Sequence, residues 1–400
     1  MKILLLTNKS PFPPRDGGAL ATFNMIRGLL ACGQQVFLLG LNTRKHAMSP
    51  GDEKTITHPA FRYLFVDINT RINPFRALFS LVLGSTPYHY TRFLCRKLTL
   101  RLTELLRTEP FDLIQVEGLP MAVYLPAIRS TCRVPVALRA HNVEHEIWNK
   151  MGQAMHPGPL SWYLRLSQKK IRRFERRILE QVDLLVPISR SDQEKFAAMR
   201  VRCPVHLSQA GLFMNEYTPA DTDNRTPDLF YIGALDWLPN RNGLGWFVQN
   251  VWPTLRQRLP SLMFHVAGRN APSPFSQRIR KQGVIFEGEV TDALRFINSH
   301  SIMVVPVFAG SGLRIKVLEG MAVAKAIVST TLGAEGIPCT HGTHLMIANN
   351  ANEFIDSITM LLGNASLRRT LGQNARDMVR ENFDNLVISA SLVDFYTARI

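Results

Sequence analysis

The sequence predicts an α/β protein of two Rossmann-like, doubly wound domains, each a parallel sheet covered by helices on both faces. Short apolar runs of strand length alternate with helical patterns along the whole chain. Because consecutive residues of these runs are apolar, rather than alternate ones, their strands are expected to be buried on both faces, as in parallel sheets. At 400 residues, the chain is also too long for one ordinary core and suits two domains.

The expected strands form two series, which divide the chain. They lie at 3–7, 35–40, 62–67, 112–116, 134–138 and 183–188, and then at 229–233, 263–267, 284–287, 302–306, 326–329 and 345–347. The polar segment 219–227 begins and ends with proline, which is typical of a linker. We therefore predict a first domain over 1–206, a second over 207–383, and a C-terminal helix of about 384–400 that packs back on the first. Parallel sheets bind ligands at the carboxyl ends of their strands, so the two domains are expected to face each other across a cleft.

The charge of the chain is concentrated in its first half. Residues 1–206 hold 30 Lys and Arg against 15 Asp and Glu, whereas the rest of the chain holds 17 against 16. Such a field attracts an anionic partner: a lipid headgroup surface, a phosphorylated acceptor or a nucleic acid. The helical pattern at 161–181 carries a basic face suited to anionic lipid, beside an apolar stripe expected in the core at Leu164, Ile171, Phe174, Ile178 and Val182. Aromatic residues are too sparse there to favour nucleic acid.

Composition also narrows the location and the cofactors. The apolar run at the N-terminus is too short for a signal peptide, and no segment approaches the ~20 apolar residues that span a bilayer. We expect a cytoplasmic protein that can bind the inner face of the cytoplasmic membrane through its basic domain. The five cysteines include no C-x-x-C pair, and Asp221 and Asp223 form a D-x-D pattern only within the linker. No cluster of His, Cys or carboxylates is evident, so we predict no metal and no cofactor.

The segment richest in chemistry lies between the strand that ends at Pro306 and a helix expected to begin near Leu313. Glycines at 310 and 312 allow a ligand to approach the backbone, and the free amides of a helix N-terminus attract phosphate. Arg314 and Lys316 oppose the helix dipole there unless an anion is bound. Glu319 lies about two turns into the helix and could accept hydrogen bonds from ribose hydroxyls. An ordinary solvated helix after a glycine loop would show the same pattern.

Three further segments follow predicted strands of the first domain. Gly17 and Gly18 come after the first strand, where they form either a phosphate-binding turn or an ordinary one. The strand at 134–138 is followed by His141, Asn142 and Glu144, and Glu117 lies at the end of another strand. His141 is a candidate ligand-binding residue because it lies at the carboxyl end of a strand, although a lone histidine is more often structural. Asn142 and the two glutamates are candidates for binding an acceptor, with ordinary surface carboxylates as the alternative for Glu117 and Glu144.

Over nearly its whole length the chain resembles glycosyltransferase family 4. Glu319, with the Gly-Met-Ala sequence at 320–322, matches the second half of the family signature, in which a Glu binds the ribose of the donor. The first Glu of that signature is replaced by Ser311. The arginine that usually follows the glycine at position 233 is replaced by Ala234. We hypothesise that Arg314 and Lys316 supply the missing positive charge. The Gly-Ser-Gly-x-Arg-x-Lys pattern, with the segment 332–336, resembles a branch involved in bacterial surface polysaccharides.

The resemblance implies the GT-B fold and metal-independent transfer from a nucleotide-diphosphate sugar, with retention of configuration, to a glycan or lipid-linked acceptor. Catalytic roles would fall to His141, Arg314, Lys316 and Glu319. Besides the last three, donor-binding residues would be Gly17, Gly18, Gly233, Ser311 and Gly312. Two other functions are open: a sugar-nucleotide epimerase of the same fold, and a catalytically inactive nucleotide-sugar-binding protein, which the substitutions at Ser311 and Ala234 would explain.

Overall fold

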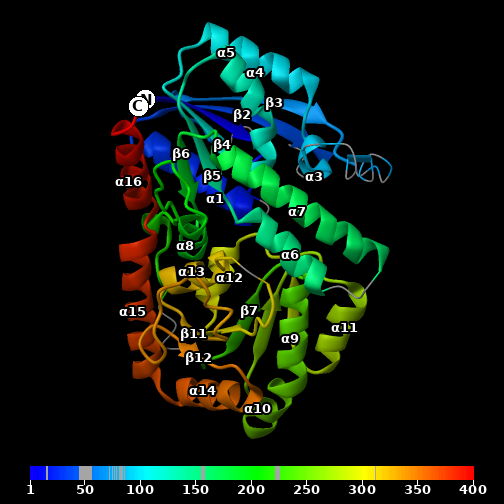
Figure 1. The fold of residues 1–400 in the computed structure, drawn as a ribbon. Helices are drawn as coiled ribbons and strands as arrows, with labels where there is room; N and C mark the ends of the chain where they lie inside the picture. The colour runs from blue at the N-terminus through cyan, green and yellow to red at the C-terminus, as the bar shows by residue number, and fades with distance from the viewer. Residues whose placement is uncertain are drawn as a thin grey trace. The chain divides into compact units, whose positions relative to one another are not determined.

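The computed structural model divides into two compact units (Figure 1). It describes residues 1–14, 17–44, 56–71, 73, 75, 77, 79–80, 84, 86–154, 158–220, 226–310 and 312–400. Unit 1 comprises Met1–Gly211 and Asn385–Ile400, and unit 2 comprises Leu212–Asp384. The first crossing between the units therefore follows residue 211, whereas the sequence placed the boundary after residue 206. Most of the predicted linker, with Asp221 and Asp223, lies outside the described residues.

Unit 1 is built on a six-stranded parallel sheet of order β3-β2-β1-β4-β5-β6. Its strands are β1 (Lys2–Thr7), β2 (Gln35–Thr43), β3 (Phe61–Ile68), β4 (Leu113–Glu117), β5 (Val136–Ala140) and β6 (Leu184–Pro187). Its helices are α1 (Gly17–Ala31), α3 (Tyr88–Thr91), α4 (Arg96–Thr108), η3 (Leu119–Tyr124), α5 (Leu125–Thr131), α6 (Glu144–Ala154), α7 (Pro159–Leu179), α8 (Arg190–Ala198) and α16 (Asn385–Thr397).

Apolar side chains cover both faces of this sheet, which explains why its strands are apolar throughout. In β1, Leu4 and Leu6 pack in a cluster that includes residues of α4, α5 and α7, while Ile3 and Leu5 pack in another with residues of α1 and α16. The C-terminal helix α16 lies against α1, where Gly28 leaves room for it: a Cβ at Gly28 would come 1.9 Å from Ser389 Oγ. The end of the chain therefore forms part of the core of unit 1.

Unit 2 has a second six-stranded parallel sheet, of order β12-β11-β10-β7-β8-β9. Its strands are β7 (Leu229–Ile232), β8 (Phe264–Ala267), β9 (Ile285–Gly288), β10 (Ile302–Val305), β11 (Ala326–Ser329) and β12 (Met346–Ile347). Its helices are η4 (Met214–Glu216), α9 (Leu238–Asn250), α10 (Trp252–Arg258), α11 (Ser273–Lys281), α12 (Ala293–Ser299), α13 (Ile315–Ala322), α14 (Ala351–Gly363) and α15 (Ala365–Phe383).

The two sheets share one topology, and this confirms the predicted fold class of two Rossmann-like domains. In each, the strand order reverses beside the first strand: between β1 and β4 in unit 1, and between β7 and β10 in unit 2. Loops that leave neighbouring strands in opposite directions open a crevice at this point, where open α/β sheets bind their ligands. The segments after β1, β4, β7 and β10 are therefore the first places to look for a functional site.

All the strands predicted from the sequence form, with ends shifted by three residues at most. The apolar residues at 244–255 predict a single helix. The structure has two helices there, α9 and α10, because Pro253 lacks a backbone N–H and begins a new helix after Val251. The helix expected near Leu313 begins at Ile315. The apolar stripe predicted on α7 is buried, as expected. Among the described residues, no helix is long and apolar enough to cross a membrane.

We predict that Gly243→Ala destabilises unit 2. Gly243 lies in α9, and a Cβ there would come 1.7 Å from the carbonyl oxygen of Pro306, so the backbone after β10 would have to shift. Overpacking of this kind costs about 1–3 kcal/mol. The matched control is Gly363→Ala at the end of α14, where a Cβ meets nothing within 4 Å. Urea unfolding should show a lower free energy of unfolding for the first variant only; equal values would contradict the packing described here.

Candidate functional site

The loop after β10 in unit 2 ends at an uncapped helix N-terminus. Gly310 and Gly312 have φ of +99° and +94°, values that side chains disfavour, so this path needs glycine at both positions. Helix α13 begins directly after Arg314, which provides no side-chain cap for it. Free amides at the start of a helix carry partial positive charge and bind anions. Ser311 of the predicted donor site lies outside the described residues.

Arg314 is held over the indole of Trp237, which lies in the loop after β7. Its Cζ lies 5.3 Å from the ring, and the same ring would be 2.9 Å from a Cβ at Gly310. The guanidinium also donates to the carbonyl of Gly312. Burial lowers the pKa of Arg314, and the nearby carboxylate of Glu335 opposes that shift. The indole thus fixes a desolvated cation beside the start of α13, where it can meet an anion.

Glu319 is buried on the second turn of α13, with 8% of its surface exposed. Its Oε2 forms an ion pair with Lys316 Nζ at 2.6 Å, and Tyr217 Oη donates to its Oε1 at 3.4 Å. The structure therefore brings together the residues predicted from this segment. It adds Trp237 and Tyr217, which the sequence analysis missed. Tyr217 gave no signal, because it lies about 100 residues earlier in the chain.

The glycine predicted after the first strand of unit 2 lies at the same switch point. Gly233 follows β7, and its carbonyl oxygen would be 2.5 Å from a Cβ at Gly268, which follows β8. The neighbouring Asn240 donates to the carbonyl of Ala234 at 3.0 Å and so holds the loop to the start of α9. Side chains pack closely against this glycine: a Cβ at Gly233 would come 2.7 Å from Tyr231 Oη and 3.1 Å from Asn240 Nδ2.

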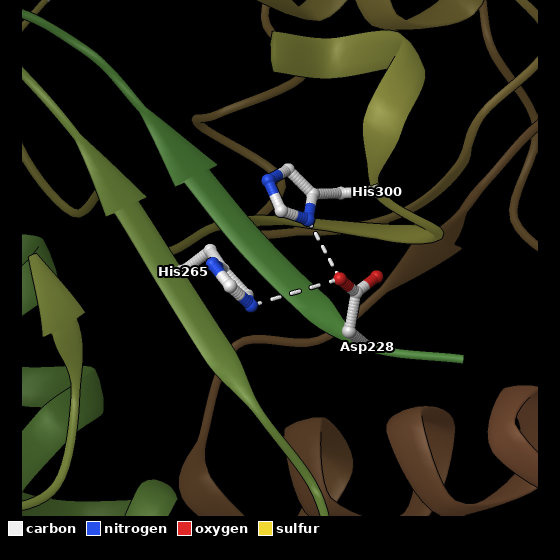
Figure 2. Close-up of side chains that lie close together, drawn as sticks. All are labelled: Asp228, His265 and His300. Atoms are coloured by element: carbon white, nitrogen blue, oxygen red, sulfur yellow. Dashed lines mark hydrogen bonds and ion pairs between the residues drawn. The ribbon is translucent and has the colours of Figure 1, made fainter. Parts of the chain in front are cut away.

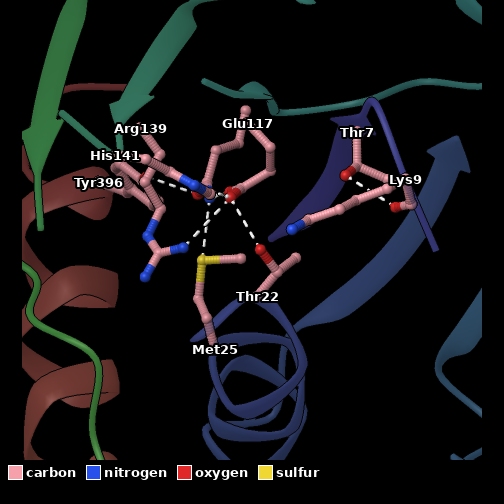
Figure 3. Close-up of polar contacts among 9 residues, drawn as sticks. Thr7, Lys9, Thr22, Met25, Glu117, Arg139, His141 and Tyr396 are labelled. Carbon is pink, nitrogen blue, oxygen red and sulfur yellow. Dashed lines mark hydrogen bonds and ion pairs between the residues drawn. The ribbon is translucent and has the colours of Figure 1, made fainter. Parts of the chain in front are cut away.

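In unit 1 the carboxylate of Glu117, at the end of β4, is the centre of a buried polar network (Figure 3). Its Oε2 accepts from Thr22 Oγ1 at 3.2 Å and contacts Arg139 Nη1 at 3.1 Å and His141 Nε2 at 2.8 Å. Its Oε1 accepts from Gln115 Nε2 at 2.5 Å. The side chains of Glu117 and Arg139 are each only 1% exposed. We had expected Glu117 to bind an acceptor; its burial instead favours a role in positioning His141.

The network also sets which nitrogen of the His141 ring faces a ligand. Burial alone would raise the pKa of Glu117, but Arg139 and hydrogen bonds from His141 and Gln115 outweigh it and lower the pKa to about 2. Because Glu117 stays ionised, it accepts the proton of Nε2, and in the neutral ring Nδ1 is left as an acceptor. The ring is 22% exposed, so this nitrogen can accept from a hydroxyl group of a ligand.

The sequence analysis missed Thr22, Gln115, Arg139 and Tyr396 of this network, and Lys9 near it. Arg139 lies within β5, and its position as a charged residue in an otherwise apolar strand could have indicated a buried polar contact. Tyr396 of α16 donates to Gln115 Oε1 at 2.6 Å, and so ties the end of the chain to the network. Lys9 follows β1, and its side chain is directed toward the network in Figure 3. Lys9 adds a cation on the same side as Gly17, which begins α1.

Glu144 and Asn142 follow β5 close to His141. Burial raises the pKa of Glu144 to about 7, and the carboxylates of Glu175 and Asp192 add to the rise. Glu175, from α7, accepts from the backbone N–H of Glu144 at 2.9 Å and contacts His145 Nδ1 at 2.5 Å, so it caps the N-terminus of α6. A carboxyl group with a pKa near 7 can both donate and accept a proton at neutral pH, as binding or polarising a hydroxyl requires. Asn142 is half-buried beside it.

One expectation from the sequence was wrong: the chain does contain a cluster of potential metal ligands. Asp228, His265 and His300 offer ligand atoms within 4.8 Å of one another. They lie toward the amino ends of the strands of unit 2, whereas the loops described above leave the carboxyl ends. Their wide separation in the sequence concealed the cluster.

Two models of known protein families match the chain, one in each unit. A family model described as "Glycosyl transferase 4-like domain" matches residues 16–207, and one described as "Glycosyl transferases group 1" matches residues 226–364. Together they span most of both units. The chain belongs to the GT4-type glycosyltransferases. A relative of this glycosyltransferase, the "Uncharacterized 44.6 kDa protein in cps region" of Klebsiella pneumoniae, is 24% identical over 404 residues, with 98% of each chain covered.

Solved structures show the same fold along the whole glycosyltransferase. Sucrose-phosphate synthase from Thermosynechococcus elongatus superposes with a TM-score of 0.71 at 16% identity, covering 100% of this chain and 99% of that one. Anabaena Alr3699/HepE in complex with UDP gives a TM-score of 0.68 at 15% identity, with 100% of both chains covered. At such identities the likeness concerns the fold alone, which is that of the GT-B glycosyltransferases.

We predict that Glu117→Gln lowers the free energy of unfolding of the glycosyltransferase by about 3–5 kcal/mol at pH 7, because Arg139 stays buried without its counter-charge. The pKa of Glu117 is lowered from 4.5 to about 2 by folding. Its contribution is therefore complete above pH 4.5 and is lost as the pH falls toward 2. The difference between wild type and variant should narrow as the pH is lowered from about 5 to about 3, as measured by denaturant unfolding.

The matched control is Glu104→Gln on α4. Glu104 pairs with Arg101 at 2.8 Å, but both side chains are more than half exposed. Exposed pairs contribute about 0–1 kcal/mol, so this variant should unfold like wild type at every pH. A Glu117→Gln protein as stable as the control at pH 7 would show that the network does not hold unit 1 together.

Proposed function

We propose that this glycosyltransferase transfers a sugar, with retention of configuration and without a metal, from a nucleotide-diphosphate sugar to a glycan or lipid-linked acceptor. The observation that carries the proposal is the N-terminus of α13. There free helix amides and Arg314 lie at the switch point of the sheet, and Lys316 pairs with Glu319 on the first two turns of the helix. A diphosphate matches the cations and amides, and a ribose matches the carboxylate.

A retaining reaction at this site needs no pair of glycosidase-type carboxylates. The donor phosphate takes the acceptor proton while the nucleotide leaves on the same face of the sugar. The main task of the chain is then to stabilise the charge that develops on the diphosphate, which preorganised amides and cations do well. We assign this task to the α13 amides, Arg314 and Lys316, with the amides of Gly17 and Gly18. His141 is proposed to accept from a hydroxyl of the donor sugar through Nδ1.

Two similarities support the choice of substrates. Anabaena Alr3699/HepE has been solved with UDP and with UDP-glucose, so uridine nucleotides are the first donors to test. The Klebsiella pneumoniae relative is named for a cps region, which supports an acceptor in cell-surface polysaccharide synthesis. Glu144, with its pKa near 7, and the neighbouring Asn142 are proposed to bind a hydroxyl of that acceptor.

The proposal predicts that two variants weaken donor binding in different ways. Glu319→Gln removes the charge that accepts from the ribose, so it should weaken both UDP and uridine by about 10- to 100-fold. Arg314→Ala combined with Lys316→Ala should weaken UDP by at least as much but leave uridine unchanged, because uridine has no phosphate. Calorimetric titration without added metal measures both ligands. Glu381→Gln, an exposed position on α15, is the control.

Turnover assays on the wild-type protein then distinguish sugar transfer from the two rival functions. Release of free nucleotide only when an acceptor is present supports transfer, whereas a change of the sugar without an acceptor indicates an epimerase. Binding of the nucleotide sugar without turnover, whichever acceptor is added, indicates an inactive nucleotide-sugar-binding protein. UDP, GDP, ADP and CMP series are compared in parallel, and failure of all of them to bind would overturn the assignment of the site.

We further propose that unit 1 meets an anionic membrane surface through α7. Trp162, Arg165, Lys169, Arg172 and Arg176 recur at intervals of three and four residues, and all are exposed. They therefore form one face of the helix, with Trp162, 58% exposed, at its beginning. An aromatic residue at the headgroup level together with a row of cations is typical of a helix that lies on a membrane.

Replacement of Lys169, Arg172 and Arg176 by Ala should lower the affinity for anionic vesicles by about two orders of magnitude, since each cation contributes about 1 kcal/mol near such a surface. Flotation with phosphatidylglycerol vesicles, compared with phosphatidylcholine vesicles and with high salt, measures this. The control replaces Arg278, Arg280 and Lys281, which are exposed on α11 of unit 2. Equal flotation of both triple variants would exclude α7 as the contact.

A further inference from the structure

Two histidines and a carboxylate meet toward the amino ends of the strands of unit 2 (Figure 2). Asp228 directly precedes β7, His300 lies two residues before β10, and His265 is the second residue of β8. Glu287, on β9, lies beside His265. Each of the first three residues thus comes from a different strand region, and the parallel register brings them to one edge of the sheet.

Both imidazoles point at the same carboxylate oxygen. His300 Nδ1 lies 2.6 Å from Asp228 Oδ2, and His265 Nε2 lies 3.9 Å from it. The second oxygen of Asp228 is already engaged, because the backbone N–H of Ser301 donates to Oδ1 at 2.8 Å. Asp228 therefore presents one oxygen to two ring nitrogens.

Glu287 fixes the orientation of one of these rings. Its Oε1 lies 2.8 Å from His265 Nδ1 and therefore accepts the proton of that nitrogen. The unprotonated nitrogen, Nε2, is then the one that faces Asp228. A histidine that ligates a metal almost always donates its other ring N–H to a carboxylate or carbonyl in this way.

The separations suit a small transition-metal ion. In a tetrahedral zinc site the ligand atoms lie about 2.0–2.2 Å from the ion, and so about 3.3 Å from one another. The observed distances of 2.6 and 3.9 Å lie on either side of that value, so small side-chain rotations bring all three atoms to one ion. The ion replaces the proton shared by His300 and Asp228, which is released.

The surroundings favour a closed site rather than a surface group of histidines. The side chains of Asp228, His265 and His300 are only 12%, 15% and 8% exposed. The ring of Phe296 packs edge-on against His300 at 4.5 Å, and Phe230 stacks on it at 5.7 Å. This apolar wall limits the access of water and holds the imidazole in place.

We propose that Asp228, His265 and His300 bind one divalent transition-metal ion such as Zn²⁺, with Glu287 supporting His265 and water completing the coordination. Two imidazoles select such an ion over Mg²⁺ or Ca²⁺, which prefer oxygen ligands. The site ties β7, β8 and the start of β10 together. Gly233, at the other end of β7, is about 15 Å away at the rise of a strand. The ion is therefore structural, and the proposed metal-independent transfer does not depend on it.

The test is a titration of the metal-free full chain with Co²⁺ and Zn²⁺. Wild type should bind one equivalent, develop the visible absorption of a tetrahedral Co²⁺ site that Zn²⁺ abolishes, and unfold at a higher temperature with metal. His265→Ala and Asp228→Asn should each lose the absorption and the thermal shift. The control, His58→Ala, removes an exposed histidine of unit 1 and should behave as wild type.

A second measurement does not depend on the folding of any variant. Imidazole ¹⁵N chemical shifts of wild type, recorded with and without Zn²⁺, should change at His265 Nε2 and His300 Nδ1, while His265 Nδ1 keeps its proton. Absence of a stoichiometric complex, or shifts confined to other histidines, would overturn the proposal. So would Co²⁺ binding that survives in both variants. UDP binding by the same samples is independent of these outcomes, so failure of the metal site leaves the donor site untouched.

Discussion

The structure depends first on a constraint of parallel sheets: every strand must be covered on both faces, and all the strands end at the same edge. In both units the strands are apolar on consecutive residues, and helices cover each face. Polar side chains are then disfavoured in the middle of the sheet, and most of those described above gather at its ends. The carboxyl edge holds the loop that leads to the uncapped N-terminus of α13, and the amino edge of unit 2 holds the histidine cluster.

The polar network around Glu117 in unit 1 is shaped by this constraint. Glu117 and Arg139 lie at the carboxyl edge but within the core, so each must neutralise the other, and the hydrogen bonds of Thr22, Gln115 and Tyr396 complete the arrangement. Burying such a network costs desolvation energy. Once it has formed, its residues are held in place, because removal of one charged residue leaves the other charge buried without a partner. That rigidity is what an imidazole needs to present one particular nitrogen to a ligand.

The proposed donor site of unit 2 uses backbone more than side chains. Positive φ at Gly310 and Gly312 leads the chain to the start of α13, and close backbone contacts at Gly233 and Gly243 keep neighbouring segments tight. A site made in this way tolerates changes of side chain. Ser311 and Ala234, which depart from the pattern of the family, therefore do not remove the features that attract an anion, and Arg314 over Trp237 adds charge nearby.

The fold class and the strands could be predicted from the sequence alone, and the segments of the proposed donor site were already evident there as a pattern. These features are local: strand burial shows as consecutive apolar residues, and a glycine loop before a helix shows as a short pattern. The prediction of a single helix at 244–255 was wrong, because Pro253 interrupts the helix although the apolar pattern continues through it. Contacts between side chains that are distant in the sequence followed from the fold. Glu117 became a buried partner of His141 rather than a surface acid, Tyr217 reached Glu319, and Asp228, His265 and His300 converged. Each of these contacts joins strands or helices far apart in the chain, and sheet order and register, which no local pattern encodes, set their distances.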